Sequence, residues 1–484
     1  MKKKIIIVLM FIMFIVSACS NIQSKVNYNK SYKSSNSNKK CTIKIVDDSG
    51  RTIKLDKPAE RIISLYSAHT ENLFALGLAD KIIGRYKSDA YPPQAIKKPA
   101  FTYRDDPERI IAAKPDLVLI RPFIEKHSPE FVKTLEKAGI NVVSLYPKKF
   151  NQFDDYINKI AVLTGTEEKA NELLKKFHKQ LNEAAKFSNK VDNKVKVFFE
   201  ATDVNLRTVT PDSMAAKTIE MAGGINIASD VKVDPNGKTS IAEYGAERIL
   251  SKANEIDVYV SQRGAMNCGG NLHTISIRPG FDKIKAIKNG RVYIINEKLI
   301  SSPVFRHIKG VHELQRMFYP EIFDDISMFN SDKVLTREKL AKIVVMAKHK
   351  PIFAPTSRTY KEKDLHVYGD FDDVDINDEY FDYIETAVLS GYVESEKYKF
   401  HPKDKVTRDE FAKVIYMIED IPMKNIKNIE VKDIDDCKNK EIVQYVVSAG
   451  IMKLKNKMFN PQKYITEKEA VEIIKGIKGT VNKK

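Results

Sequence analysis

The chain has 484 residues, which is too long for one hydrophobic core and predicts about two to four compact units. Its net charge of +17 suits an anionic neighbourhood, such as nucleic acid, membrane headgroups, a wall polymer or an anionic ligand. The N-terminus disfavours nucleic acid, because Lys2 to Lys4 followed by an apolar run from Ile5 to Val16 is typical of a secretion signal. That run is shorter than the ~20 residues that a membrane-spanning helix needs.

The predicted signal segment ends in Val16-Ser17-Ala18-Cys19, which resembles a bacterial lipobox. The resemblance implies that residues 1–18 are a signal peptide and that Cys19 is lipidated. A plain signal peptide is the alternative. Residues 19–41 are rich in Ser, Asn and Lys and predict a flexible basic tether. The other cysteines, Cys41, Cys268 and Cys437, form no CxxC pair, so we expect free or buried thiols and no zinc site.

The next part of the chain predicts a hairpin and then parallel βαβ units. Residues 42–56 alternate apolar and polar side chains around Asp48-Ser49-Gly50, which indicates the hairpin. Continuous apolar runs at 62–65, 117–120 and 142–145 are separated by stretches with helical spacing. Strands of a parallel sheet that is covered on both faces have this pattern. Ligands bind beyond the carboxyl ends of such strands.

The middle of the chain predicts a helical connection and then a second lobe. Residues 150–190 show apolar positions at helical spacing, interrupted by Gly165, and Thr166 is expected to cap the second stretch. The runs at 195–199, 256–260 and 290–295 predict the strands of the second lobe.

Several phrases together resemble the substrate-binding proteins of ABC importers for ferric siderophores, haem and cobalamin. They are DSGRTIKL, PAERIISL, LFALGLADKIIG, ERIIAAKPDLVL and LEKAGINVV. The resemblance covers about residues 42–322. It implies an α/β fold of two Rossmann-like lobes, 42–149 and 191–323, joined by one long helix within 150–190. It also implies an ABC permease with its ATPase as partners, and no enzymatic activity.

The predicted ligand contacts lie at the expected strand ends. They are Tyr66, Ser67, Arg85, Tyr86, Tyr103, Arg104, Arg121, Arg207, Arg263 and Arg306. A cleft lined by arginine and tyrosine suits an anionic iron chelate of the siderophore type, with no covalent cofactor. Cobalamin, which is less anionic, fits the arginines less well, and haem would need an axial ligand. The histidines His69, His127, His273 and His307 are expected to be polar contacts rather than metal ligands.

Two acidic residues, Glu108 in PERII and Glu247 in AERIL, occur at matching places in the two lobes. In the family that the chain resembles, a surface glutamate on each lobe docks onto the permease, which implies this role for both. An ordinary acid in the first turn of a helix is the alternative interpretation.

From residue 328 onward the chain repeats. Phe-x6-Thr occurs at Phe329, Phe400 and Phe459, which predicts an array of helical units at 328–350 (partial), 371–419 and 431–479 within 328–480. The phrases FDDV, SGYV, FHP and TRDE resemble the S-layer homology module. This implies an all-α module in which Arg337 and Arg408 bind a negatively charged, often pyruvylated, wall polymer. The third unit has Thr466-Glu467 in place of Thr-Arg. A degenerate module that has only a structural role is therefore the alternative to wall binding.

These observations predict a lipid-anchored receptor on the extracellular face of a Gram-positive cell membrane, tied to the cell wall by its C-terminal module. A structural surface protein that has lost transport is one alternative. An enzyme is disfavoured, because nothing in the chain assembles a nucleophile, a base and oxyanion donors.

Overall fold

The computed structural model describes residues 43–89, 91–233, 239–264, 267, 269–352, 371–375, 378–419 and 428–481. The predictions for the signal peptide, the tether, Cys19, Cys41 and Cys268 lie outside the described residues. Cys437 is described, and it is a buried free thiol. In the described ranges, every helix is too short or too polar to cross a membrane.

The first described element is the predicted hairpin. Strands β1 (Ile43–Val46) and β2 (Thr52–Leu55) pair antiparallel, with Ile43 opposite Leu55. The Asp47 carboxylate accepts hydrogen bonds from the backbone N–H of Ser49 at 3.0 Å and of Arg51 at 2.9 Å. These bonds close the turn, so the hairpin prediction is confirmed.

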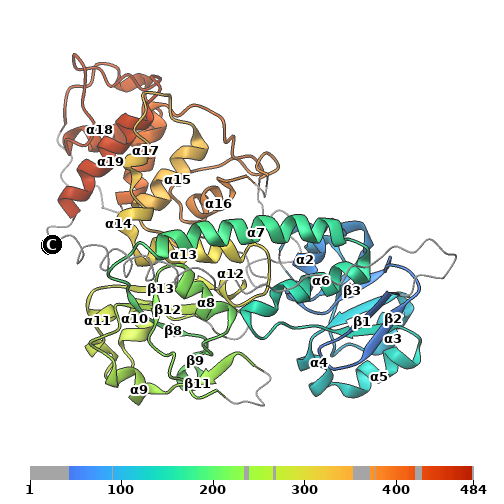
Figure 1. Ribbon diagram of the computed structural model, residues 1–484. Coiled ribbons are helices and arrows are strands. Elements are labelled where there is room, and N and C mark those ends of the chain that lie inside the picture. Colours follow the sequence, from blue (N-terminus) through green and yellow to red (C-terminus); the bar gives the residue numbers. More distant parts are fainter. Residues whose placement is uncertain are drawn as a thin grey trace, which may run out of the picture. The chain divides into compact units, whose positions relative to one another are not determined.

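The first lobe contains a five-stranded sheet in which every neighbouring pair is parallel (Figure 1). Its order is β5 (Ala100–Phe101), β4 (Ile82–Tyr86), β3 (Ile62–Ser64), β6 (Leu117–Ile120) and β7 (Asn141–Ser144). All four residues of β6 are buried, as expected for a central parallel strand with helices on both faces. The parallel βαβ prediction is therefore confirmed.

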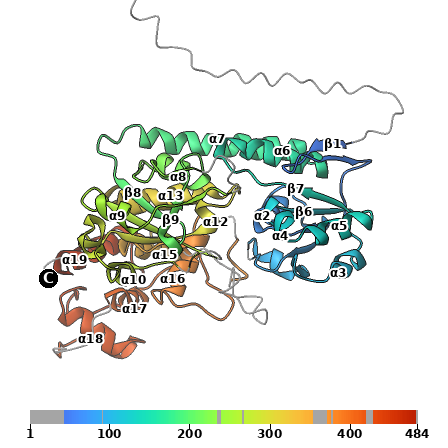
Figure 2. The same ribbon diagram turned by 90° about the horizontal axis from the view of Figure 1, so that it is seen from below.

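Helices cover this sheet. They are α2 (Ser67–Ala75), α3 (Pro107–Ala112), α4 (Pro122–His127) and α5 (Pro129–Lys137). Helix α5 packs beside β7 through Phe131, Val132 and Leu135 (Figure 2). Asp106 begins α3, since its side chain accepts a hydrogen bond from the Glu108 N–H at 3.1 Å.

The connection between the lobes contains two helices, α6 (Phe153–Thr164) and the longer α7 (Glu167–Ser188), so the predicted interruption at Gly165 is confirmed. Gly165 ends α6 with a φ of +69°, and an added Cβ there would lie 2.9 Å from Pro58. Only glycine fits this left-handed, crowded position. Thr166 precedes α7, but its side chain bonds to Thr164 at 2.9 Å instead of capping α7, which corrects the predicted cap.

The second lobe also contains a parallel sheet. Its order is β10 (Ile225–Asn226), β8 (Lys196–Glu200), β12 (Val258–Arg263) and β13 (Val292–Asn296), and a separate pair joins β9 (Arg207–Val209) to β11 (Ile241–Glu243). Strand β12 continues three residues past the apolar run that predicted it. Ser261, Gln262 and Arg263 therefore lie inside the strand rather than beyond it.

Seven helices flank the second sheet in the described residues. They are α8 (Met214–Met221), α9 (Ala246–Ser251), α10 (Leu272–Ser276), α11 (Lys285–Lys288), α12 (Glu297–Ile300), α13 (His307–Phe318) and α14 (Pro320–Phe323). Phe318 and Tyr319, at the end of α13, belong to the large core that also contains residues of the first lobe.

The C-terminal repeats form helices with a separate core. The helices are α15 (Arg337–Ala347), α16 (Phe381–Leu389), α17 (Arg408–Glu419), α18 (Lys440–Ser448) and α19 (Glu467–Val481). The repeated Phe329, Phe400 and Phe459 are all buried in this core. Three backbone hydrogen bonds close a ring before α15, α17 and α19. Leu335 donates to Ile465 at 2.9 Å, Ile465 to Val406 at 3.0 Å, and Val406 to Leu335 at 3.0 Å.

Candidate functional site

The carboxyl edge of the first sheet gathers aromatic and basic side chains. Tyr66 follows β3, Tyr86 ends β4, and Arg121 follows β6 directly. Tyr103 and Arg104 follow β5. Because parallel strands end at one edge, residues that are far apart in the sequence meet there.

Arg121 lies at the centre of this aromatic cluster. Its guanidinium carbon is 5.0 Å from the Tyr66 ring centre and 4.9 Å from that of Phe123. Phe123 meets the Tyr103 ring edge-on at 6.1 Å, and Arg104 lies 5.5 Å from that ring. Burial raises the pKa of Tyr66 and of Tyr86, so both phenols are neutral at physiological pH. Rings that alternate with guanidinium groups can hold a flat or aromatic anionic ligand.

Two members of this edge were not predicted. Phe123 is the third residue beyond β6 and is 41% exposed, and Tyr146 lies 6.1 Å from Tyr66 between ring centres. Tyr146 directly follows the predicted run at 142–145, so the same strand-end rule applied to β7 identifies it.

Arg85 does not join the cluster, which corrects its predicted ligand contact. Arg85 lies inside β4, which continues through Tyr86, and not beyond the end of the strand. Arg85 is therefore buried, and its guanidinium donates to the carbonyls of Tyr86 at 3.1 Å and Lys87 at 3.2 Å. It holds the loop after β4 in place.

Ser67 and Arg306 are also engaged inside the protein, contrary to their predicted ligand contacts. Ser67 is buried, with its hydroxyl 3.4 Å from that of Ser88. The Arg306 Nε donates to the Glu71 carboxylate at 2.6 Å, and the guanidinium lies 3.9 Å from the Tyr91 ring centre. Both side chains of the Arg306–Glu71 pair are only 9% exposed, so Arg306 links the end of the second lobe to α2 of the first.

The second lobe contributes two exposed arginines, Arg207 at the start of β9 and Arg263 at the end of β12. Glu200, at the end of β8, is instead fully buried. It accepts hydrogen bonds from Tyr259 at 2.6 Å and Ser261 at 2.9 Å, and it pairs with Arg278.

Glu108 and Glu247 occupy matching positions in the two lobes. Each lies in the first turn of a short helix, α3 or α9, and each is exposed. Both geometries agree with the sequence expectation of an acidic group that a partner can reach.

In the part of the chain that the structure describes, the histidines and other possible metal ligands do not gather into a metal site. His69 and His307 are buried, and burial lowers the pKa of His69 to about 3 and that of His307 to about 4. His69 Nε2 lies 3.0 Å from the carbonyl of Leu145. Within the described ranges, no group of three or more His, Cys, Asp or Glu residues could hold a metal ion.

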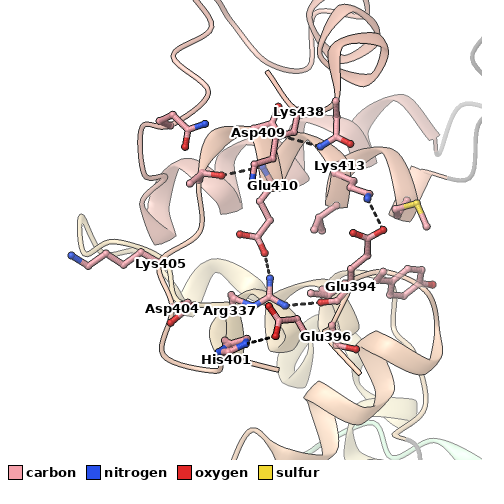
Figure 3. A pocket seen from close by; sticks show the side chains of 18 residues that line it. Arg337, Glu394, Glu396, His401, Asp404, Lys405, Asp409, Glu410, Lys413 and Lys438 are labelled. Carbon is pink, nitrogen blue, oxygen red and sulfur yellow. Dashed lines mark hydrogen bonds and ion pairs between the residues drawn. The ribbon is translucent and has the colours of Figure 1, made fainter. Parts of the chain in front are cut away.

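The C-terminal module contains a groove of about 600 Å³ around Arg337 (Figure 3). Arg337 begins α15, and its guanidinium lies 4.8 Å from the Phe400 ring centre. Its Nε donates to the carbonyl of Phe400 at 2.9 Å, and it pairs with Glu410 of α17. Figure 3 shows Glu410 pointing at this guanidinium, and Lys413 pointing at Glu394.

Comparison with protein families gives two matches. Residues 62–299 match the model described as periplasmic binding protein. Residues 370–412 and 431–471 match the S-layer homology domain.

Individual relatives cover the first of these regions. An ABC transporter substrate-binding lipoprotein of Bacillus subtilis, YvrC, is 29% identical over 289 residues, which are 58% of this chain and 87% of that protein. A vitamin B12-binding protein of Vibrio cholerae is 24% identical over 259 residues, 53% of this chain and 88% of that protein. A crystal structure of a possible iron-binding protein from Staphylococcus epidermidis is 27% identical, covers 54% of this chain and 100% of its own, and has a TM-score of 0.48.

Proposed function

Because residues 62–299 belong to the periplasmic binding protein family and two later segments are S-layer homology domains, we propose that the chain is the substrate-binding component of an ABC importer. The relatives support this proposal, since the B. subtilis protein is named as such a component. The observation that carries it is the aromatic cluster at the sheet edge, where Arg121 lies between the rings of Tyr66 and Phe123.

The proposed ligand is an anionic iron chelate of the siderophore type. Arg104 and Arg121 on the first lobe, with Arg207 and Arg263 on the second, supply the positive charge, and Tyr66, Tyr86 and Tyr103 supply aromatic area. Carboxylate or catecholate groups would pair with the guanidinium groups, while the rings pack against the body of the chelate.

A cobalamin ligand is the second candidate. The named vitamin B12-binding relatives favour it, and so does the engagement of Arg85 and Arg306 inside the protein. The loss of these two predicted contacts lowers the positive charge available to a ligand. The remaining site is more aromatic than the sequence suggested, because Phe123 and Tyr146 are added to it.

Isothermal titration of the protein with ferric citrate, a ferric catecholate, haem and cyanocobalamin separates these candidates. We expect saturable binding of a ferric chelate that weakens about 10-fold or more in Arg121→Ala, because a charge-assisted contact is lost. Arg109→Ala is the matched control, since Arg109 is exposed on α3 beside Phe101. Binding of cyanocobalamin alone would replace the iron chelate with the second candidate. Failure of every ligand to bind would favour the structural surface protein.

The permease is proposed to dock on Glu108 and Glu247. Exposed acids at helix starts can pair with basic pockets without disturbing the fold. Replacing both with glutamine is expected to leave the ligand dissociation constant unchanged while uptake through the cognate permease falls. Equal uptake by the variant and the wild type would contradict the docking role.

Anchoring and wall attachment complete the proposal. Cys19 is proposed to carry a lipid anchor that holds the protein on the extracellular face of the membrane. Cys19→Ala should therefore release the protein into the medium, as an immunoblot of the culture supernatant can show. The module is proposed to bind an anionic wall polymer through Arg337 and Arg408, supported by the groove of about 600 Å³ at Arg337. Cosedimentation with Gram-positive cell walls, before and after hydrofluoric acid removes their polysaccharide, tests this role.

A further inference from the structure

Two acidic side chains of the module occupy equivalent places in successive repeats. Glu338 is the second residue of α15, and Asp409 is the second residue of α17. The N–H of Glu338 donates to the Pro402 carbonyl at 3.0 Å. In the same way, the N–H of Asp409 donates to the Pro461 carbonyl at 3.1 Å. Both side chains are buried, so the surroundings of the two carboxylates can be compared directly.

Glu338 has a counter-ion from its own chain. Lys403, the residue after Pro402, places its Nζ 2.6 Å from the Glu338 carboxylate. The lysine side chain is 72% exposed, whereas the glutamate side chain is only 6% exposed. An ammonium group that approaches from solvent can therefore reach a carboxylate at this place in the repeat.

Asp409 has no such counter-ion. The residue after Pro461 is Gln462, which is exposed and carries no charge. Asp409 Oδ2 accepts a hydrogen bond from the Asn439 amide at 3.0 Å. Its Oδ1 is buried and has no hydrogen-bond partner among the described residues. Because a buried carboxylate oxygen without a donor costs free energy, a bound donor is favoured at this position.

Asp409 lines the groove of about 600 Å³ that Figure 3 shows. Tyr392, Val393 and Val414 add apolar surface to the same lining. Ligand grooves in proteins commonly combine apolar walls with a few polar groups that fix the orientation of the ligand. A sugar ring suits this groove, because its C–H face can pack on the apolar side chains while a polar substituent reaches the carboxylate.

The charged side chains that line the groove leave it negative. Arg337 is paired with Glu410. Lys413 is paired with Glu394 at 2.5 Å. Figure 3 shows Lys405 directed away from the other labelled side chains. Among the described lining residues, this leaves three carboxylates and one ammonium group, which are those of Glu396, Asp404, Asp409 and Lys438. A unit of a wall polymer that carries an ammonium group is therefore favoured here.

We propose that this groove binds, at Asp409, the ammonium group of an unacetylated amino sugar. The ammonium takes the place that the Lys403 Nζ has at Glu338, and it donates to Asp409 Oδ1. Neither Arg337 nor Arg408 takes part in this contact. A chain with a net charge of +17 repels a polycationic protein, but not a single amine in an anionic polymer. The choice of a sugar as the source of the amine rests on the proposed wall-binding function.

The test is titration of the protein at about pH 6, where a sugar amine is protonated. The probes are diacetylchitobiose and its mono-deacetylated form, which differ in a single acetyl group. We expect the wild type to bind the amine-bearing form about 10- to 100-fold more tightly, because the amine adds a charge-assisted hydrogen bond. Asp409→Asn keeps the shape of the side chain and removes its charge, so the preference should fall below about twofold. Glu338→Gln is the matched control and should keep the preference, since the Glu338 carboxylate already holds Lys403.

A second variant leaves Asp409 unchanged. Gln462→Lys supplies the missing counter-ion at the place that Lys403 has in the preceding repeat. Because Gln462 is exposed, this substitution should not disturb the fold, and it should abolish the preference for the amine. Equal binding of both probes by the wild type overturns the assignment. So does a preference that persists in both Asp409→Asn and Gln462→Lys.

Cosedimentation with Gram-positive cell walls separates this inference from the wall function. Acetylating the free amines of the walls should weaken binding of the wild type and leave that of Gln462→Lys unchanged. Equal binding of the wild type before and after acetylation keeps the wall function and overturns the ammonium site. Loss of binding after mild alkali, which removes aminoacyl esters and keeps amino sugars, overturns the sugar as the source. If no walls bind while the amine-bearing disaccharide is still preferred, the wall function fails and the ammonium site stands.

Discussion

Two buried histidines make the stability of the protein depend on pH. Burial lowers the pKa of His69 to about 3 and that of His307 to about 4, whereas an unfolded histidine titrates near 6.5. Between these values the unfolded chain binds protons that the native imidazoles do not bind. The free energy of unfolding therefore falls as the pH falls below 6.5, by up to about 1.4 kcal/mol per pH unit for each histidine.

His69→Gln isolates this effect, because glutamine can still donate to the Leu145 carbonyl. We expect the stability difference between wild type and variant to change steadily from pH 6.5 to pH 4, in urea unfolding at each pH. Buried carboxyls such as Glu71 and Glu313 have raised pKa values and act with the opposite sign, but they are present in both proteins. Parallel curves for the two proteins would contradict a neutral buried His69.

The Arg306–Glu71 pair leads to a second prediction. Each side chain is 9% exposed, so Arg306→Ala leaves a carboxylate in a buried place without its cation. Breaking a buried pair in this way costs about 3–5 kcal/mol, and urea unfolding at pH 7 measures the loss. Arg104→Ala removes an exposed arginine from the same predicted set and should cost less than about 0.5 kcal/mol. Similar costs for the two variants would argue against the buried role of Arg306.

These arginines show what the sequence could not predict. The strand-end rule found Tyr66, Tyr103, Arg104 and Arg121, because they directly follow apolar runs or lie close to them. It failed for Arg85, since a strand that continues through charged residues has no apolar signal at its end. It also failed for Arg306, because its partner Glu71 is 235 positions away and nothing local indicates the pair.

Among elements, the ion pair between Glu467 of α19 and Lys339 of α15 can be tested by itself. Glu467→Arg places a guanidinium next to Lys339 in a largely buried position, and we expect a loss of about 1–3 kcal/mol in urea unfolding. The double variant Lys339→Glu, Glu467→Arg restores opposite charges. It places the arginine at the start of one helix and the glutamate on the neighbouring helix, as in the Arg337–Glu410 pair. It should recover most of that loss, with a coupling energy of about 0.5–3 kcal/mol.

The exposed pair Lys133–Glu130 on α5 is the control for this cycle. Its side chains are 60% and 79% exposed, so solvent screens the pair and exchanging the two residues should give a smaller coupling energy than at Glu467–Lys339. If the coupling energy of the Glu467–Lys339 pair is no larger than that of the control, the pair does not hold α19 to α15.

The elements also show where sequence patterns were sufficient. Continuous apolar runs predicted β6 to the residue, because a central parallel strand is buried on both faces. The repeated Phe-x6-Thr predicted helical units, since each phenylalanine enters the core and each threonine precedes a helix. The ring of three backbone bonds was not predictable, because it joins residues from all three repeats and depends on no particular side chain.

At the scale of the whole molecule, α13 joins the receptor region to the module. Residues Thr42–Lys484 form one compact unit, and side chains of α13 in the receptor region are hydrogen-bonded to the backbone of Lys350 and Ile352 in the module. Arg316 donates to Asp324 at 2.6 Å, to Glu313 at 2.9 Å and to the carbonyl of Lys350 at 3.0 Å. The second oxygen of Glu313 accepts the N–H of Ile352 at 2.8 Å.

This network predicts that the receptor region and the module unfold together. The side chains of Arg316, Glu313 and Asp324 are all less than 10% exposed, so Arg316→Met leaves two buried carboxylates without their cation. We expect a loss of about 3–5 kcal/mol, and scanning calorimetry should then resolve two transitions where the wild type shows one.

Lys309→Ala is the matched control on the same helix. Lys309 pairs with Asp382 of α16 at 2.5 Å, but its side chain is 35% exposed, so its removal should cost less than about 1 kcal/mol and keep a single transition. A single transition in Arg316→Met at the wild-type temperature would show that the buried network does not couple the two regions. Two transitions in the wild type would show that the core that begins at Ile326 is stable without α13. In that case, binding of the module to the wall would not fix the orientation of the receptor.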